Sequence, residues 1–208
     1  MHYWLCHMPL TAVSVALTIL VGCASTQPSR FYVLSDLRSL ETAQQLTPAG
    51  QGPGIGLGPI TLPKYLDRPQ IATLAGRYEL TFAEFDRWAE PIETTFARAL
   101  AEQLSTLIPT ERIAIYPWPR GTPIDYQVTV EVTHFLGQIG GASALIANWT
   151  IARGEGKEVV VSRKSRFNAH ATGQGYEAVV AAMSQTVAAL SREIAAVTRT
   201  LAPTASDR

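Results

Sequence analysis

The stretch GPITLPKYLDRPQIAT (residues 58–73) begins as a strand, turns sharply and resumes as a second strand. Its first apolar run reaches Pro63, which cannot donate the hydrogen bond that a strand ladder requires. Pro69 then restricts the residue before it to an extended conformation. The stretch therefore predicts two strands joined by a compact turn, in which Tyr65 and Leu66 pack inward.

The turn itself places an acidic residue beside a basic one. Asp67 is expected to hold the turn through its own backbone, as Asx residues do. Arg68 has two interpretations. It links the turn to the segment that follows, through Asp67, Asp86, Glu90 or the ring of Trp88, or it faces a binding partner.

Segments with strand periodicity lie on both sides of this stretch. Alternating or short apolar runs, bounded by glycine, proline or charged turns, predict strands. These strands cover residues 31–34, 55–62, 70–75, 78–83, 112–117, 125–135, 142–153 and 158–170. We expect a hairpin around Gly76, whereas the turn-rich residues 41–54 predict a loop.

Two other segments repeat apolar residues with the period of a helix. Residues 90–109 begin with Pro91, which suits a first helical turn, and with Glu90 and Glu93, which suit the positive end of the helix dipole. Residues 176–201 carry a longer stripe, expected to lie across the sheet; the alternative is that part of it packs against a partner. The two stripes consist of Ile92, Phe96, Leu100, Leu104 and Leu107, and of Tyr176, Val180, Met183, Val187, Leu190, Ile194, Val197 and Leu201.

The segment 125–135 alternates more cleanly than any other. Tyr126 and every second residue to Val132 form one apolar face, and polar residues form the other. The alternation slips at His134 and Phe135, which predicts a bulge or the end of the strand. Together with the strands and helices that follow, this order predicts a single α/β domain with a mixed, mostly antiparallel sheet and two main helices.

The amino-terminal segment predicts export and lipid attachment. Residues 10–22 form an apolar run of signal-peptide length, too short to span a membrane comfortably. LVGC at residues 20–23 resembles the lipobox of bacterial lipoproteins, which implies cleavage before Cys23 and acylation of its thiol. Ala24 in the next position implies sorting to the outer membrane. The alternatives are an ordinary secretory signal with a chance cysteine, or an N-terminal membrane helix.

On this interpretation the chain has three parts: a signal peptide (residues 1–22), a tether (residues 23–30) and one domain (residues 31–202). Fully extended, the tether reaches about 25 Å at most. The domain is therefore expected to stay close to the membrane surface.

A basic group at Arg163, Lys164 and Arg166 offers a possible contact with anionic lipid headgroups. Each basic residue near such a surface contributes about 1 kcal/mol. The alternative is a strand face that is simply solvated.

Composition and motif spacing argue against several functional classes. The formal net charge is zero, which gives no electrostatic basis for nucleic-acid binding. His134 and His170 lack the neighbours that a metal site requires. The glycines of residues 52–58 lack the lysine of a phosphate loop, and no G-x-S-x-G elbow occurs. We therefore expect no metal, no cofactor and no enzymatic activity.

PKYLDRPQ at residues 63–70 and RWAEP at residues 87–91 together resemble the ABC-type transport auxiliary lipoprotein family, the paraquat-inducible-C-like lipoproteins. In that family a strand ends in proline, Tyr-Leu-Asp-Arg-Pro-Gln follows, and Arg-Trp-Ala-Glu-Pro precedes a helix. The order of elements also agrees from residue 31 to the C-terminal helix. The residues that match this motif, and are candidates for partner binding, are Pro63, Tyr65, Leu66, Asp67, Arg68, Pro69, Gln70, Arg87, Trp88, Glu90 and Pro91.

The resemblance implies a function in envelope lipid transport. It implies a non-enzymatic outer-membrane lipoprotein that faces the periplasm. Such a subunit would contact the periplasmic mammalian-cell-entry (MCE) component of a system driven by an ABC transporter, and a homo-oligomeric ring is among the expected arrangements. The alternative is a free-standing structural lipoprotein that maintains envelope integrity.

Overall fold

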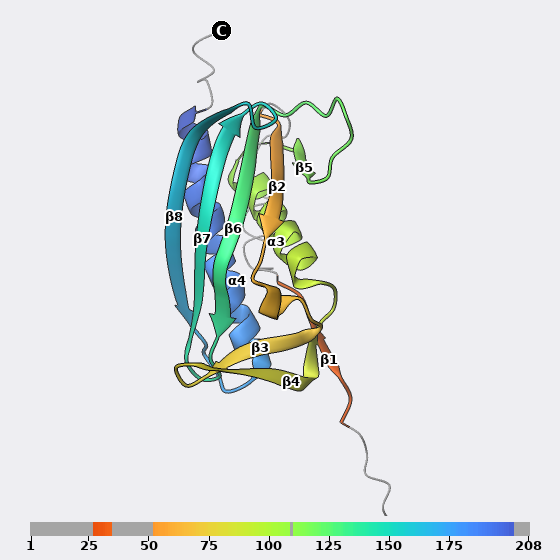
Figure 1. Ribbon diagram of the computed structural model, residues 1–208, viewed down its shortest axis with the longest axis vertical. Helices are drawn as coiled ribbons and strands as arrows, with labels where there is room; N and C mark the ends of the chain where they lie inside the picture. Colours follow the sequence, from red (N-terminus) through yellow and green to blue (C-terminus); the bar gives the residue numbers. More distant parts are fainter. Residues whose placement is uncertain (1–26, 35–51, 109, 202–208) are drawn as a thin grey trace, which may run out of the picture.

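The largest part of the molecule is an antiparallel meander of three long strands, β6 (Tyr126–Gly137), β7 (Ala142–Arg153) and β8 (Glu158–His170) (Figure 1). The computed structural model describes residues 27–34, 52–108 and 110–201. The pairings of β7 with β6 and with β8 both run along almost its whole length. Alternate side chains of β6 and β7 are buried on one face, as the sequence of β6 predicted, whereas in β8 only Ser165 is buried.

The predicted slip in β6 is a β-bulge. The register of β6 against β7 shifts between Val132 and His134. Phe135 is consequently fully buried, whereas His134 is half-buried. One extra residue in one strand of a pair produces such a change of face, and the strand continues beyond it to Gly137.

Shorter strands extend the sheet to eight strands. β2 (Ile55–Thr61) lies parallel to β6, and β5 (Ile113–Ile115) lies parallel to β2. β3 (Gln70–Ala75) and β4 (Glu79–Trp88) form the predicted hairpin, and β1 (Arg30–Tyr32) lies parallel to β4. The order is β1-β4-β3-β6-β2-β5, with β7 and β8 continuing from β6. The sheet is therefore mixed, with its longest pairings antiparallel, as predicted.

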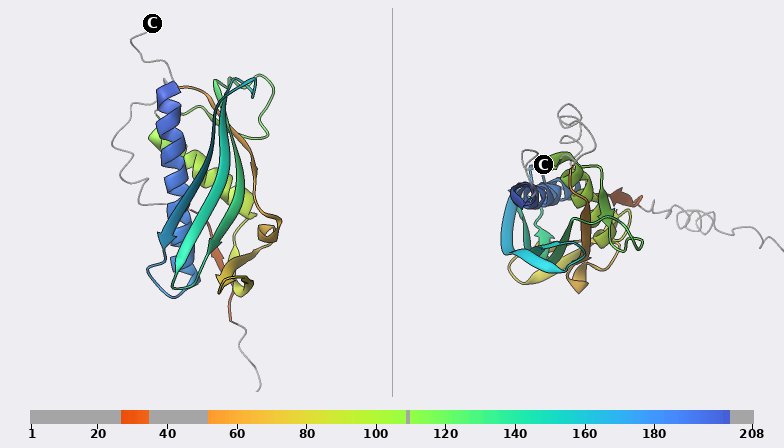
Figure 2. Two further views of the ribbon diagram at one scale, coloured as in Figure 1. Left: turned by 60° about the vertical axis from the view of Figure 1, so that its left-hand side comes forward. Right: turned by 90° about the horizontal axis from the view of Figure 1, so that it is seen from above.

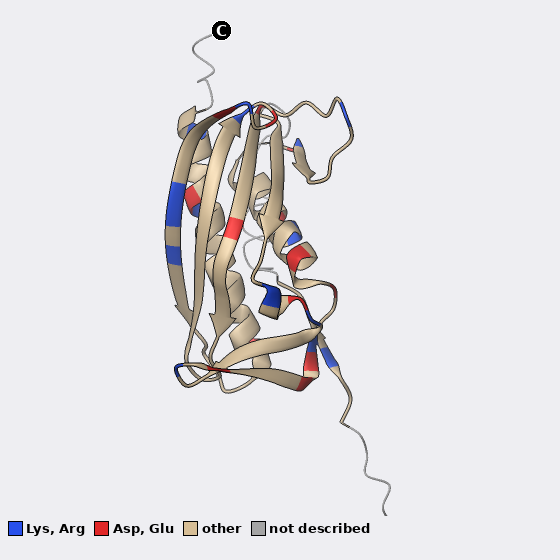
Figure 3. Cartoon of the chain, in the orientation of Figure 1, with Lys and Arg blue, Asp and Glu red and all other residues tan. Residues whose placement is uncertain are grey.

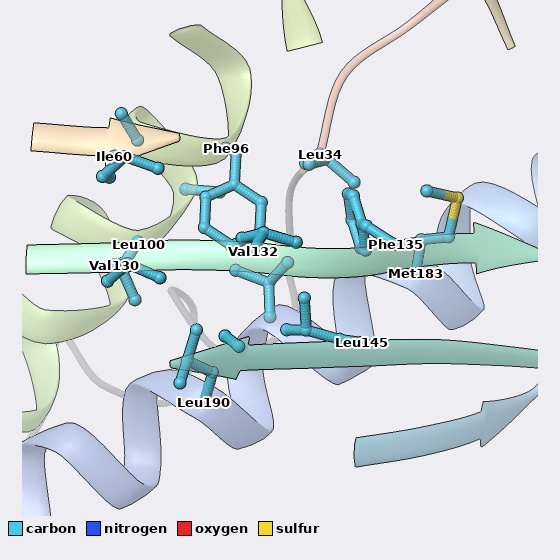
Figure 4. Close-up of a cluster of buried hydrophobic side chains, with 14 of the residues drawn as sticks. Leu34, Ile60, Phe96, Leu100, Val130, Val132, Phe135, Leu145, Met183 and Leu190 are labelled. Carbon is cyan, nitrogen blue, oxygen red and sulfur yellow. The ribbon is translucent and has the colours of Figure 1, made fainter. Parts of the chain in front are cut away.

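Two helices, α3 (Ile92–Leu107) and α4 (Tyr176–Leu201), cover one face of the sheet (Figure 2). Helix α4 packs on β6, β7 and β8, and α3 packs on β2, β5 and α4. The expectation that α4 lies across the sheet is confirmed. Between the layers, the rings of Phe96 and Phe135 meet edge to face, with centroids 5.4 Å apart (Figure 4).

Two hydrogen bonds, a buried one between the helices and a partly buried one between sheet and helix, hold these elements together at particular points. Ser191 Oγ in α4 donates to Gln103 Oε1 in α3 at 2.7 Å. The hydroxyl of Tyr126, at the start of β6, donates to the carbonyl oxygen of Leu201, at the end of α4, at 2.6 Å. Such bonds fix one register of the helices on the sheet, because a buried polar group that loses its partner is costly.

Several element bounds differ from those predicted. β4 continues to Trp88, beyond the expected residue 83, because β1 pairs along its other edge. α3 begins at Ile92, since Pro91 is the N-cap residue, and its carbonyl oxygen accepts hydrogen bonds from Thr94 and Thr95. Most of the predicted loop 41–54 lies outside the described residues.

Candidate functional site

The turn after β2 is a short 3-10 helix, η2 (Lys64–Leu66), that follows Pro63. Backbone hydrogen bonds close it: the N–H groups of Leu66 and Asp67 donate to the carbonyl oxygens of Pro63 and Lys64, at 2.9 and 3.1 Å. Leu66 is buried and Tyr65 half-buried, as expected, and burial raises the pKa of the Tyr65 hydroxyl. The compact turn predicted from the two prolines is therefore present.

The two halves of the family motif meet directly. The backbone N–H of Trp88 donates to the carbonyl oxygen of Pro69 at 2.7 Å. Gln70 and Arg87 are Cα partners in the β3–β4 pairing. One residue further, the N–H of Ala89 donates to the carbonyl oxygen of Tyr32 at 2.9 Å. The β3–β4 hairpin thus brings residues 87–88 back beside residues 69–70, and α3 begins four residues later.

A surface cleft of about 700 Å³ lies where these halves meet. Its apolar floor includes Trp88 and Ile92, which are both buried. Charged side chains of both signs surround the floor. The complete lining is Thr61, Leu62, Pro63, Lys64, Asp67, Arg68, Pro69, Trp88, Ala89, Glu90, Pro91, Ile92, Glu93 and Thr94.

Most motif residues that the sequence singled out therefore reach one place. The remaining four lie beside or beneath the cleft: Tyr65, Leu66, Gln70 and Arg87. Sequence reasoning missed the lining residues between and beyond the motif halves, such as Thr61, Lys64 and Glu93. The one feature of the sequence that could have identified these residues is that they lie close to motif residues along the chain.

A smaller cavity of about 390 Å³ adjoins the cleft. Both are lined by Thr61, Glu93 and Thr94, so the depression continues along β2 and α3. It ends beside Ile115 and Tyr116, which are exposed. The cleft is therefore one part of an elongated surface feature rather than an isolated pit.

Arg68 does not make the internal contacts that the sequence suggested. Its guanidinium stacks over the ring of Phe82 in β4, 3.9 Å from the ring centroid. Glu90 instead pairs with Arg98 at 2.7 Å. Trp88 is buried, so its ring is not available as a stacking surface for an exposed guanidinium. The sequence did not indicate Phe82, because no motif includes it.

Asp86, the other expected partner, belongs to a different cluster. It pairs with Arg30 Nε at 2.8 Å and accepts a hydrogen bond from the Tyr32 hydroxyl at 2.8 Å. Burial and then the hydrogen bond to Asp86 raise the pKa of Tyr32, and the same carboxylate raises the pKa of Arg30. This cluster fixes β1 against β4.

The three basic residues of β8 do not share one face. Arg163 pairs with Glu193 of α4 at 3.4 Å and lies 5.8 Å from the ring centroid of Trp149. Lys164 and Arg166 are exposed; their alternation with Ser165, which is buried, places them on the outer face. Figure 3 shows basic positions along β8 and an acidic position on β6 of the same sheet. Headgroup contact remains a prediction; all three residues are exposed, but only Lys164 and Arg166 share a face.

Other expectations concern residues that the structure does not describe. The signal peptide and the first half of the tether (residues 23–26), which includes Cys23, lie outside the described residues. Within the described ranges, no helix is long and apolar enough to cross a membrane. The same ranges contain no cluster of three or more histidine, cysteine or acidic side chains that could hold a metal ion.

The profile of one protein family, ABC-type transport auxiliary lipoprotein component, matches residues 32–195. This chain belongs to that family. The match covers the cleft, both halves of the motif and most of α4. The resemblance read from the motif is therefore confirmed, and the chain is an auxiliary lipoprotein component of ABC-type transport.

Individual relatives agree with this assignment. The chain is 25% identical over 172 residues to the intermembrane transport lipoprotein PqiC of Escherichia coli, covering 83% of this chain and 88% of PqiC. An uncharacterized protein of known crystal structure shares the fold, with a TM-score of 0.65 and 20% identity, over 85% of this chain and all of that one. A Xanthomonas campestris protein does so with a TM-score of 0.60 and 18% identity, over 75% and 93% of the two chains.

Proposed function

We propose that this chain is a non-enzymatic, lipid-anchored subunit of an envelope lipid-transport system, and that its cleft contacts the periplasmic MCE component. One observation carries the proposal. In a member of a transport-auxiliary family, the two halves of the motif converge on one cleft at the surface. Residues needed only for folding would have no reason to gather around an open depression.

The chemistry of the cleft suits a protein segment better than a small metabolite. Its floor is apolar, and the exposed residues Lys64, Asp67, Arg68 and Glu93 place both signs of charge around it. Such a combination of apolar core and polar rim is typical of protein interfaces. The adjoining cavity beside Tyr116 lengthens the surface that such a segment could follow.

The anchor completes the proposed arrangement. Cys23 would carry the lipid and, with Ala24 next to it, would place the domain at the outer membrane, facing the periplasm. Several acyl chains give stable attachment because each buried CH₂ contributes about 0.8 kcal/mol. Several copies arranged as a ring would present several clefts to one MCE assembly.

Co-purification tests the proposed contact. The tagged protein is extracted in mild detergent, and the retained proteins are identified by mass spectrometry. We expect an MCE-domain protein with the unaltered chain, and its loss with Lys64→Glu combined with Glu93→Lys at the rim of the cleft. The matched control is Lys157→Glu with Glu155→Lys, which makes the same charge changes at exposed positions of the β7–β8 turn.

Each result decides one part of the proposal. If the unaltered chain retains no MCE-domain protein, the transport contact is wrong and a free-standing structural lipoprotein is favoured. If the cleft variant retains it as well as the control does, the contact lies elsewhere on the surface. Labelling with radioactive palmitate tests the anchor separately, and Cys23→Ala is expected to abolish incorporation.

A further inference from the structure

Three large apolar side chains are exposed at one end of the domain. Tyr78 is 89% exposed, Phe31 64% and Ile139 41%. Tyr78 directly precedes β4 and Phe31 pairs with Arg87 near its other end, so these residues are spread across the breadth of this end and do not form one compact patch. We call this group the apolar end.

Strand pairing brings these residues to the same end although they are distant in the sequence. Phe31 pairs with Arg87 of β4, and Tyr78 lies in the turn between β3 and β4. Thr73 of β3 pairs with Gly137, the last residue of β6, so the β6–β7 turn with Ile139 adjoins the hairpin. Figures 1 and 2 show β1, the hairpin and the β6–β7 turn together at this end.

The chain also enters the domain here. Cys23 precedes the first residue of β1 by only seven positions. Even a fully extended chain of this length reaches about 25 Å at most. A lipid attached to Cys23 therefore holds this end of the domain, and not the opposite one, near the bilayer.

The charges at the apolar end are balanced, so its contact would not depend on an anionic surface. Arg30 is paired with Asp86 at 2.8 Å. Arg77 lies 5.9 Å from the ring centroid of Tyr78, and Glu79 follows directly. Figure 3 shows both signs of charge side by side on β1 and β4. Aromatic rings with one polar edge suit the boundary between headgroups and acyl chains.

We propose that the apolar end rests on the bilayer that holds the anchor, with Phe31, Tyr78 and Ile139 in the headgroup region. This inference depends on the lipid anchor of the proposed function. The domain then stands upright, with the long strands roughly normal to the membrane and the cleft on its side. The anchor and the apolar end together fix the direction in which the cleft faces.

Tryptophan fluorescence in vesicles tests this contact. The full lipid-modified chain is reconstituted into phosphatidylcholine vesicles with and without bromine on the acyl chains, because bromine quenches only nearby tryptophan. Tyr78→Trp and Phe31→Trp place a reporter at the apolar end. Val159→Trp is the control: this residue is 61% exposed and lies at the other end of β8. Flotation confirms attachment, and circular dichroism confirms folding.

We expect brominated lipid to quench the fluorescence added at positions 78 and 31, with no loss at position 159, and an unchanged result when anionic lipid is included. If the chain floats but positions 78 and 31 are not quenched, the inference is wrong and the anchor stands. A blue-shifted but unquenched signal there also overturns it, and indicates that a second copy or another protein covers this end. A chain that does not float overturns the anchor and this inference with it.

Discussion

The meander with α4 and the cleft region are built in different ways. The meander consists of strands of 12 and 13 residues under a helix of 26 residues. The cleft is lined by short segments: the end of β2, η2 and the turn after it, the end of β4, and the start of α3. Individual backbone hydrogen bonds join these segments, such as the one from the Trp88 N–H to the Pro69 carbonyl oxygen.

This difference teaches where each kind of substitution should act. In the meander the buried side chains of the inner face belong to one continuous core, so a loss there reduces the stability of the whole domain. In the cleft region many side chains that line the surface are exposed. Their replacement should alter binding while the domain remains folded.

The largest effect is expected in the core. Phe135→Ala, in β6 of the meander, removes a ring that is fully buried and packs edge to face on Phe96. Truncation of a buried phenylalanine costs about 3–5 kcal/mol. Urea denaturation followed by circular dichroism would measure this loss of unfolding free energy. Phe82→Ala, at a partly exposed ring near the cleft, should cost about 1 kcal/mol; equal losses would remove the distinction between the regions.

Loss of the hydrogen bond between Ser191 of α4 and Gln103 of α3 should lower the unfolding free energy by an intermediate amount. Ser191→Ala leaves Gln103 Oε1 buried without the donor that now reaches it at 2.7 Å. An unsatisfied buried group costs about 1–3 kcal/mol. Gln103→Leu combined with Ser191→Ala removes both partners and should recover part of this cost. A double-mutant cycle measured by thermal and urea denaturation would show whether the two residues are coupled; simple additivity would contradict the prediction.

Arg68→Ala should separate binding from stability. The lost stacking over Phe82 is expected to cost about 0.5–1 kcal/mol, because the site is exposed. Capture of the MCE-domain protein should fall strongly, since Arg68 lines the cleft. Arg163→Ala is the control: that residue also lies near an aromatic ring, Trp149, but in the meander, where it pairs in addition with Glu193. A large drop in melting temperature with unaltered capture would reject a docking role for Arg68.

The smallest effect concerns the outer face of the meander. Burial lowers the pKa of His134, and the charge of Arg166 lowers it further. Arg166→Gln should therefore raise this pKa, yet leave it below about 6.5 because the burial remains. An NMR titration of the imidazole would measure the shift. A pKa that stays where it was would show that the two residues do not interact.

The lowered pKa of His134 also determines how the stability of the domain changes with pH. The His134 pKa is lowered in the folded chain, so the unfolded chain binds a proton more readily. The contribution of His134 is therefore complete above about pH 6.5 and is lost as the pH falls through the lowered folded value. The pH dependence of unfolding in this range should be weaker in Arg166→Gln than in the unaltered chain.

The sequence predicted the meander well, because the spacing of apolar residues along one segment indicates which of its faces is buried. The apolar face of β6, the slip at His134 and the stripe of α4 all required only the spacing of residues along the chain. The motif also predicted which residues gather at the cleft, but through resemblance to a family rather than through local physics.

Contacts between distant segments could not be predicted in the same way. Arg68 had four plausible neighbours within 22 positions, yet it stacks on Phe82, which no pattern marks. The parallel pairing of β1 with β4 was likewise hidden, because three residues carry too little periodicity to specify a partner. The length of β4 followed from that pairing and was therefore underestimated.

Helix α4 begins at the end of the domain where the chain enters and finishes at the other, where the Tyr126 hydroxyl holds the carbonyl oxygen of Leu201. At 1.5 Å per residue, its 26 residues span about 39 Å. The two ends of the domain are therefore held about this far apart. A reporter fused after α4 would stand about that far from the first strand, on the side remote from the tether.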